Sequence, residues 1–401
     1  MTEYAVAVVG AGIIGCLVAR EIAARAPGTR VLVLDRDAVA AGASRRSAGL
    51  HLPKGGTGRT RRMASFSHRY FADLARSHPG LPIYPVAVTV VAGPGDTGEV
   101  IGRYLPLASP QPAATTPAGS VTLPAGSAGT RALPAGSAGP LMLPAGSAGP
   151  LMLPTGSAGA LTLPAGSGAW RIGGGHYCDV PRLTQELAAL LRPRVTFAEG
   201  VAVTGLVPGG DGGGKIGVEC GTGGRLTAAA VVLTPGPWLA APAWRDLIAP
   251  MQLRVKRIAA LHIPVPPGPG DEAVVFESDD AFLLPLTHRG HWLFSYRCPE
   301  WDVEPDRLAG GLTAAQLSEA QELLRRYSPA LADACVGGRT FCDAYSPGGE
   351  PVVAPLDPAG RIVFAGAGGG SGYRLGPAIA AEAAELLAHR SEGAISDLER
   401  V

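Results

Sequence analysis

Apolar residues at the start of the chain follow the order of a strand, a glycine-rich turn, a helix and a second strand. Residues 5–9 are consecutive small and β-branched apolar residues, as in a strand that is buried on both faces. A helical pattern follows the glycines and continues to about residue 26, and a second apolar run spans residues 31–34. The pattern predicts a β-α-β unit in the interior of an α/β fold.

The turn of this unit has the glycine spacing of a dinucleotide site. Gly10 allows the tight turn, Gly12 lets the backbone approach a pyrophosphate at the positive end of the helix, and Gly15 lets the helix pack closely on the strand. Asp35 ends the second strand about twenty residues after the last glycine, where an acid accepts hydrogen bonds from ribose hydroxyls. The alternative is a glycine-rich turn in an ordinary α/β domain. The site is expected to comprise Gly10, Gly12, Ile13, Ile14, Gly15, Asp35 and Arg36.

Beyond this unit, helical patterns alternate with groups of strands. A helix is expected at 180–191, with Asp179 as its N-cap and Pro181 in its first turn. The order predicts an α/β nucleotide domain interrupted by an antiparallel β domain. The other predicted elements are strands at 195–198, 201–203, 225–233, 255–264, 273–276, 281–286, 292–296 and 362–365, and helices at 314–327 and 377–389.

Residues 106–169 differ from the rest of the chain in composition. A ten-residue unit that starts Leu-Pro-Ala-Gly-Ser or Leu-Pro-Thr-Gly-Ser recurs five times from Leu123 to Leu163. Charged residues are almost absent, and the segment is too poor in apolar side chains to offset its ordering entropy. We predict a flexible or polyproline-like insertion, with a stacked β-solenoid as the alternative.

Composition and charge exclude several classes of protein. The 401 residues suffice for two domains, and the net charge of +1 gives no broad field that would attract nucleic acid or an anionic membrane. The six cysteines show no metal-ligand spacing, so we expect reduced thiols and no metal site. The chain has no run of eighteen apolar residues and no secretory signal pattern, so we expect a cytoplasmic protein without a membrane span.

Four further stretches, together with the first unit, resemble the FAD-dependent amine oxidoreductases typified by D-amino-acid oxidase, glycine oxidase and sarcosine oxidase. Residues 42–49 look like the family's loop under the pyrophosphate and flavin edge, and 199–203 like the strand whose valine pairs with adenine. Residues 234–238 resemble the Gly-Ala-Trp turn, and 370–378 the loop and helix start over the flavin. The resemblance adds to the FAD site the residues Ser44, Arg45, Arg46, Ser47, Ala48, Gly49, Val203, Pro235, Gly236, Trp238, Gly370, Ser371, Gly372, Tyr373, Arg374 and Leu375.

The resemblance implies a fold class and a division of the chain. The fold is an α/β FAD-binding Rossmann-like domain interleaved with an antiparallel β-sheet substrate domain, plus the low-complexity insertion. The FAD-binding domain is expected to be discontinuous. It comprises residues 1–80, 170–245 and 343–401, the substrate domain comprises 81–105 and 246–342, and the insertion comprises 106–169.

The resemblance also implies an activity. A C–H bond next to the nitrogen of a small-molecule amine or amino-acid-like substrate is oxidised by hydride transfer to flavin N5, which gives an imine. In the oxidase members dioxygen reoxidises the flavin and hydrogen peroxide is released. Three alternatives stay open: a monooxygenase, a dehydrogenase with another electron acceptor in specialised metabolism, and a non-catalytic flavoprotein whose insertion binds a partner.

The substrate-side residues depart from the family pattern. Members acting on simple α-amino acids often place an arginine where this chain has Asp343, which would repel a carboxylate and favour a cationic amine. The alternative is that Arg297, Arg339 or Arg374 takes over the carboxylate. We expect the catalytic cavity to include Tyr345, Arg297, Asp343 and His51, the last of which follows the 42–49 loop and either faces the flavin or packs.

Two positions bear on the flavin linkage and on the electron acceptor. Sarcosine oxidases carry a cysteine bonded covalently to the flavin, and Cys342 lies within one residue of the matching position, so a covalent link and a buried inert thiol are both open. Those enzymes also use a lysine on a substrate-domain strand to promote the reaction with oxygen. The comparable strand here offers Leu293, with Lys256 on a neighbouring strand, so the acceptor stays open.

Overall fold

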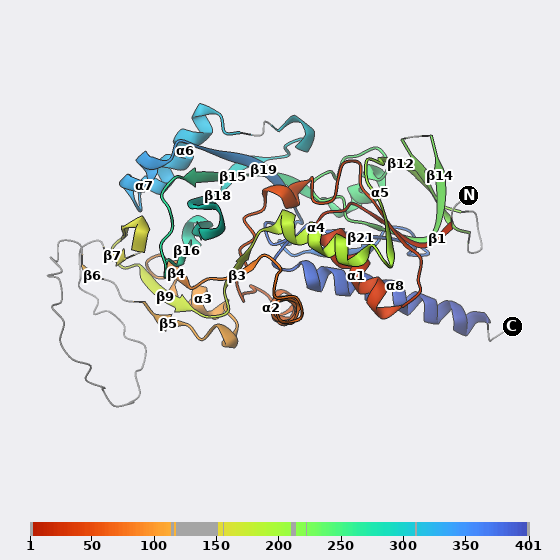
Figure 1. The fold of residues 1–401 in the computed structure, drawn as a ribbon, viewed down its shortest axis with the longest axis horizontal. Coiled ribbons are helices and arrows are strands. Elements are labelled where there is room, and N and C mark those ends of the chain that lie inside the picture. Colours follow the sequence, from red (N-terminus) through yellow and green to blue (C-terminus); the bar gives the residue numbers. More distant parts are fainter. Residues whose placement is uncertain are drawn as a thin grey trace.

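A computed structural model describes residues 3–113, 116–117, 151–154, 156–209, 214–221, 223–308 and 311–398 of the chain. The described residues form two large sheets that lie side by side along the longest axis (Figure 1). The sheet that contains the N-terminal strand lies in the half of the molecule where both termini are found.

The first sheet contains the β-α-β unit that the N-terminal sequence predicts. Its strands follow the order β11-β2-β1-β14-β13-β12, with β21 beside β14 and β20 beside β21. The neighbouring pairs β11–β2, β2–β1, β1–β14 and β14–β21 are parallel, and the other pairs are antiparallel. The strands are β1 (Glu3–Val9), β2 (Val31–Leu34), β11 (Val195–Ala198), β12 (Val203–Val207), β13 (Ile216–Cys220), β14 (Arg225–Leu233), β20 (Val352–Pro355) and β21 (Ile362–Gly366).

Four helices share a core with β1 and β2 of this sheet. They are α1 (Ile13–Arg25), α2 (Gly58–Ser77), α4 (Val180–Leu191) and α8 (Gly376–Leu398). Helices α1 and α8 pack on the strands of the sheet, and α4 and α2 pack against these two helices. The side chain of Asp179 accepts a hydrogen bond from the backbone of Arg182, as predicted for the N-cap of α4. A Cβ atom at Gly15 would collide with the carbonyl oxygen of Gly10, so a glycine at this position lets α1 lie against the turn.

The second sheet has the order β19-β15-β18-β17-β16-β4-β9-β5. We expected it to be antiparallel throughout, but β4 and β16 are parallel. These two strands are joined through elements of the other sheet rather than by a hairpin, so no short turn imposes an antiparallel direction. The strands are β4 (Val88–Ala92), β5 (Gln111–Pro112), β9 (Gly168–Ile172), β15 (Arg254–Ile263), β16 (Ala273–Phe276), β17 (Ala281–Leu286), β18 (His291–Trp301) and β19 (Gly337–Tyr345).

Smaller elements complete the described residues. Two short strands form an antiparallel pair, β3 (Ile83–Pro85) with β10 (His176–Cys178), and three form a separate sheet, β6 (Thr116–Pro117), β7 (Leu151–Pro154) and β8 (Ala160–Leu163). The short α-helices are α3 (Thr97–Gly102), α5 (Arg245–Ile248), α6 (Ala314–Arg325) and α7 (Pro329–Ala334). The 3-10 helices are η1 (Ala43–Arg46), η2 (Pro106–Ala108), η3 (Gly156–Ala158), η4 (Ala249–Met251), η5 (Glu277–Asp279), η6 (Thr287–Arg289) and η7 (Pro305–Arg307).

The end of the repeat segment corrects the prediction of a flexible insertion over 106–169. Leu161 and Leu163 are fully buried in the core that the second sheet shares with α6 and α7, and the backbone of Thr162 bonds to Tyr327 at 2.8 Å. Strand β9 then begins inside the expected insertion, at Gly168. Leu161, near the end of the fourth repeat unit, and Leu163, which begins the fifth, therefore supply the apolar surface that the segment lacks on average. Residues 118–150, which include the first two repeat units and most of the third, lie outside the described residues, so the solenoid alternative stays untested there.

Candidate functional site

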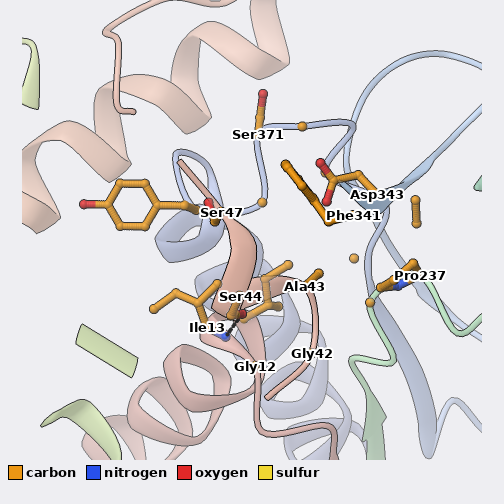
Figure 2. Close-up of a pocket in the computed structure, with 18 of the residues that line it drawn as sticks. Gly12, Ile13, Gly42, Ala43, Ser44, Ser47, Pro237, Phe341, Asp343 and Ser371 are labelled. Atoms are coloured by element: carbon orange, nitrogen blue, oxygen red, sulfur yellow. Dashed lines mark hydrogen bonds between the residues drawn. The ribbon is translucent and has the colours of Figure 1, made fainter. Parts of the chain in front are cut away.

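A cavity of about 630 Å³ joins the two sheets. Its wall runs from the turn after β1 to strand β19, and it includes the end of β2, the loop 234–238 and the glycine-rich loop 366–374. In Figure 2 the start of α1 and the 42–47 loop lie on one side of this space, with Phe341, Asp343 and Ser371 across from them. The volume falls in the range of cavities that bury small molecules and cofactors.

The predicted dinucleotide turn has the backbone geometry that its glycines suggest. Gly10 has a φ of +110°, which is open to glycine but strained for other residues. Gly12 is the N-cap of α1 and supplies no side chain to the helix start, so the positive end of the helix faces the cavity. The backbone of Ile13 donates to the hydroxyl of Ser44 at 2.9 Å, which fixes the 42–49 loop on the helix start (Figure 2).

Asp35 lies at the end of β2 and reaches back to this turn. Its carboxylate accepts hydrogen bonds from the backbone of Ala11 at 2.7 Å and of Asp37 at 2.9 Å. Burial raises the pKa of Asp35, while these two backbone bonds oppose the shift. The arrangement holds an acceptor at the cavity wall where the fingerprint requires one for ribose hydroxyls.

Most of the predicted cofactor residues meet at this cavity. Arg45, Arg46 and Leu375 lie outside its wall: Arg45 is exposed, Arg46 donates to the carbonyl of Thr340 at 3.0 Å, and Leu375 is buried in the helix core. The sequence could not separate them because motif spacing does not show where a side chain points. The lining residues are Gly10, Gly12, Ile13, Ile14, Gly15, Asp35, Arg36, Ser44, Ser47, Ala48, Gly49, Val203, Pro235, Gly236, Trp238, Gly370, Ser371, Gly372, Tyr373 and Arg374.

Strand β19 presents its side chains to the cavity at alternate positions. Phe341, Asp343 and Tyr345 line the cavity beside the glycine-rich loop. A Cβ atom at Gly369 would lie 3.1 Å from the ring of Tyr345, so the loop can approach this strand closely only with glycine there. Of the predicted catalytic residues, Asp343 and Tyr345 line the cavity, whereas the side chain of Arg297 in β18 lies outside the described atoms.

Cys342 points away from the cavity. Its side chain is buried in the core on the far face of β19, and burial together with Asp343 raises the pKa of its thiol to about 12. Because side chains alternate between the two faces of a strand, Phe341 and Asp343, the neighbours of Cys342, line the cavity instead. The geometry favours the buried inert thiol over the covalent flavin link.

His51 does not face the cavity, which corrects its prediction as a catalytic residue. The side chain is fully buried and stacks on His176, with ring centroids 4.4 Å apart, and on His68 at 5.6 Å. Burial, with a contribution from His176, holds the pKa of His51 well below its ordinary value. The ring therefore packs as a neutral group that supports the segment after the 42–49 loop. His176 in turn contacts the hydroxyl of Tyr373 at 2.9 Å.

A buried ion pair at the cavity wall was missed by the sequence analysis. The ammonium of Lys54 donates to both carboxylate oxygens of Glu277 at 2.6 and 2.8 Å, and the hydroxyl of Tyr104 donates to the same carboxylate at 2.6 Å. Arg374 donates to the carbonyl of Lys54 and, at 2.8 Å, to the hydroxyl of Ser371. Lys54 and Glu277 belong to no motif, and the one available signal was the scarcity of lysine in an arginine-rich chain.

The two members of this pair meet the cavity unequally. The side chain of Lys54 is 25% exposed and that of Glu277 only 5%, although both line the cavity. Burial lowers the pKa of Lys54, and Glu277 opposes that shift. Burial alone would raise the pKa of Glu277, but Lys54 and Tyr104 hold it below its ordinary value. The ammonium of Lys54 is therefore the partner that is more exposed to the cavity, and the carboxylate of Glu277 that balances its charge is more deeply buried.

The described part of the chain contains no group of three or more histidine, cysteine or acidic side chains placed to hold a metal ion. None of its helices is long and apolar enough to cross a bilayer.

Comparison with known proteins identifies the family. The family model described as FAD dependent oxidoreductase matches residues 5–386. The chain belongs to this family and is an FAD-dependent oxidoreductase. A search of curated protein sequences finds no significant match. The glycine turn, the start of α1 at the cavity wall and the carboxylate of Asp35 fit the pyrophosphate and ribose of FAD.

Solved structures share the fold at low identity. One is NikD, described as an unusual amino acid oxidase essential for nikkomycin biosynthesis, with a TM-score of 0.70 and 18% identity over 96% of this chain and 94% of its own. L-proline dehydrogenase from P. horikoshii has a TM-score of 0.70 and 16% identity over 96% and 93%. Glycine oxidase from Geobacillus kaustophilus has a TM-score of 0.67 and 17% identity over 97% and 95%.

Proposed function

We propose that this enzyme oxidises the C–H bond next to the nitrogen of an amino acid or amine to an imine, with dioxygen as the final electron acceptor. The observation that carries the proposal is the single cavity that joins the dinucleotide turn to Asp343 and Tyr345 on the second sheet. Such a cavity can hold a cofactor and a small substrate against one another. The names of NikD, glycine oxidase and L-proline dehydrogenase describe proteins that act on amino acids, which supports this substrate class.

The second-sheet end of the cavity combines the carboxylate of Asp343 with aromatic walls. FAD, when bound, accepts the hydride and thereby supplies the redox chemistry. Asp343 attracts a positively charged amine nitrogen by a charge-assisted hydrogen bond. Four aromatic side chains line the same region: Phe282, Tyr296, Phe341 and Tyr345. They exclude water, which strengthens the attraction between Asp343 and the amine, and they orient the substrate.

A dehydrogenase that passes its electrons to another acceptor is the second candidate. Leu293, at the position where sarcosine oxidases carry their lysine, is fully buried. Lys256 lies outside the cavity wall with its ammonium over the ring of Trp301 at 4.6 Å. One similar structure is described as a dehydrogenase. Neither of the two positions considered for an oxygen-activating lysine therefore places a lysine at the cavity. The lysine that lines the cavity is Lys54.

A turnover screen tests the proposal and separates the two candidates. The FAD-loaded protein is incubated with D- and L-amino acids, N-methyl amino acids and simple amines, first in air and then without oxygen in the presence of an artificial dye acceptor. The proposal expects a carbonyl product and hydrogen peroxide in air. Product formed only with the dye would establish the dehydrogenase. No product with either acceptor, from a protein that holds FAD, would contradict amine oxidation.

A further inference from the structure

Two cavity residues at the dinucleotide end are stacked on each other. The guanidinium of Arg36 lies over the ring of Trp238, 4.6 Å from its centroid, and both residues line the cavity. Arg36 directly follows Asp35, the acid placed for the ribose. A Cβ atom at Gly42 would lie 3.0 Å from the ring of Trp238, so the ring also packs on the loop that leads to η1. The stack therefore lies at the end of the cavity that fits the adenosine half of FAD.

A third residue, from the 3-10 helix that follows strand β18, contacts both members of this stack. The carboxylate of Asp306 accepts hydrogen bonds from Arg36 Nη1 at 3.1 Å and Nη2 at 2.5 Å. It also accepts one from Trp238 Nε1 at 2.8 Å. Asp306 belongs to η7, which follows β18, and it is not part of the cavity wall itself. One carboxylate thus connects three segments that are far apart in the sequence.

The geometry makes this contact stronger than an ordinary surface ion pair. The side chains of Arg36 and Asp306 are 42% and 62% exposed, and an isolated pair at that exposure contributes little. Here the two guanidinium bonds are parallel, the third bond comes from an indole, and the guanidinium is also stacked on that indole. Bidentate geometry and a shared network are the conditions under which exposed charges contribute measurably.

We propose that Asp306 is a positioning residue for the cofactor: it latches Arg36 and Trp238 over the adenosine half of FAD, so that the segment around η7 must release before FAD can leave. Asp306 has no part in the oxidation itself. The latch also links the second sheet to cofactor retention, because η7 follows β18 of that sheet. This inference concerns FAD binding alone and is independent of the substrate proposed above.

The test compares FAD release from the wild type, Asp306→Ala and a matched control. Glu304→Ala is the control because Glu304 lies in the same segment, is 64% exposed and pairs with Arg307 at 2.7 Å rather than with a cavity residue. Release is followed after dilution by the increase in fluorescence of free FAD, and the affinity of the apoprotein for ADP is measured by titration. We expect Asp306→Ala to release FAD about fivefold faster and to bind ADP about fivefold more weakly, with Glu304→Ala unchanged.

Salt and a second variant sharpen the test. Because the latch is an exposed charge contact, 0.5 M potassium chloride should accelerate release from the wild type and leave Asp306→Ala nearly unaffected. Asp306→Asn keeps an acceptor for Trp238 but loses the charge, so its release rate should lie between those of the wild type and the alanine variant. Equal release rates and ADP affinities for the wild type and Asp306→Ala at low salt would overturn the proposal, as would an equal effect of Glu304→Ala.

Discussion

The ammonium of Lys54 is bound to both carboxylate oxygens of Glu277, at 2.6 and 2.8 Å, across 223 residues of sequence. The bond ties the segment that follows the 42–49 loop to η5 of the second sheet. It does so at the cavity wall, with the lysine as the more exposed partner. The segment that follows the 42–49 loop and the turn between β16 and β17 are therefore connected at the cavity wall.

Removal of this ammonium should destabilise the fold. Lys54→Met leaves the carboxylate of Glu277 buried, with Tyr104 as its remaining donor among the contacts described above. We expect a loss of about 2–3 kcal/mol in the free energy of unfolding, below the full cost of breaking a deeply buried pair because Lys54 meets the cavity. Urea unfolding of the FAD-loaded protein measures it.

Matched variants test whether the unpaired carboxylate of Glu277 causes the loss of stability in Lys54→Met. Lys54→Met combined with Glu277→Gln should recover most of the loss, since it removes the uncompensated carboxylate. Lys215→Met breaks an exposed pair with Glu3 and should change stability by less than about 0.5 kcal/mol. A double variant less stable than Lys54→Met would contradict the explanation.

The flavin should be bound without a covalent link. Cys342 is directed into the core behind β19, away from the cavity. Acid precipitation should therefore release all of the flavin into the supernatant, and Cys342→Ala should hold as much FAD as the wild type. Flavin that stays in the wild-type pellet and leaves the pellet of Cys342→Ala would show that the strand presents the thiol to the cofactor.

The histidine stack predicts loss of stability in acid. Burial holds the pKa of His51 well below its ordinary value and lowers the pKa of His176 to about 3, whereas both titrate near 6.5 in an unfolded chain. Below about pH 6.5 the unfolded chain thus binds more protons, so stability falls as the pH falls toward the folded values. Each histidine contributes a slope of up to about 1.4 kcal/mol per pH unit.

One substitution isolates the contribution of His51 to this slope. His51→Phe keeps an aromatic ring in the stack and removes the titrating group. The dependence of the unfolding free energy on pH, measured between pH 6.5 and 4.5, should become shallower by up to about 1.4 kcal/mol per pH unit. An unchanged slope would show that His51 is not held neutral in the folded protein.

Asp343 should determine the preference for a positively charged substrate. Asp343→Asn is expected to raise the KM for an active cationic amine about tenfold, in line with the loss of a charge-assisted hydrogen bond. FAD affinity should not change. Asp333→Asn removes an exposed carboxylate that pairs with Arg325 at 2.9 Å and serves as the control. A KM that is unaffected by Asp343→Asn would remove this residue from the substrate site.

The dinucleotide half of the site could be predicted because its information is local. Gly10, Gly12, Gly15 and Asp35 lie within one β-α-β unit, and the backbone geometry that they require follows from their spacing. The direction of a side chain in a strand is harder to predict, because a shift of one residue moves it to the other face. For this reason the sequence alone leaves open whether Cys342 faces the flavin, whereas the structure has Phe341 and Asp343 lining the cavity.

Contacts between distant segments could not be predicted from one sequence. Lys54 meets Glu277, and Arg36 meets Asp306, across more than two hundred residues and without a motif in either case. The burial of Leu163 was also missed, because low average hydrophobicity hides single leucines that a neighbouring helix can cover. These features follow from how the two sheets pack together, which no local pattern records.

The most direct test of the central claim is the visible absorption spectrum of the FAD-loaded protein, recorded without oxygen before and after addition of amino acids and amines. The account predicts the bands of bound oxidised flavin and their bleaching by at least one compound that carries a C–H bond next to an amine nitrogen. A protein that holds FAD but is bleached by none of these compounds, while NADPH alone bleaches it, would contradict amine oxidation and favour the monooxygenase class.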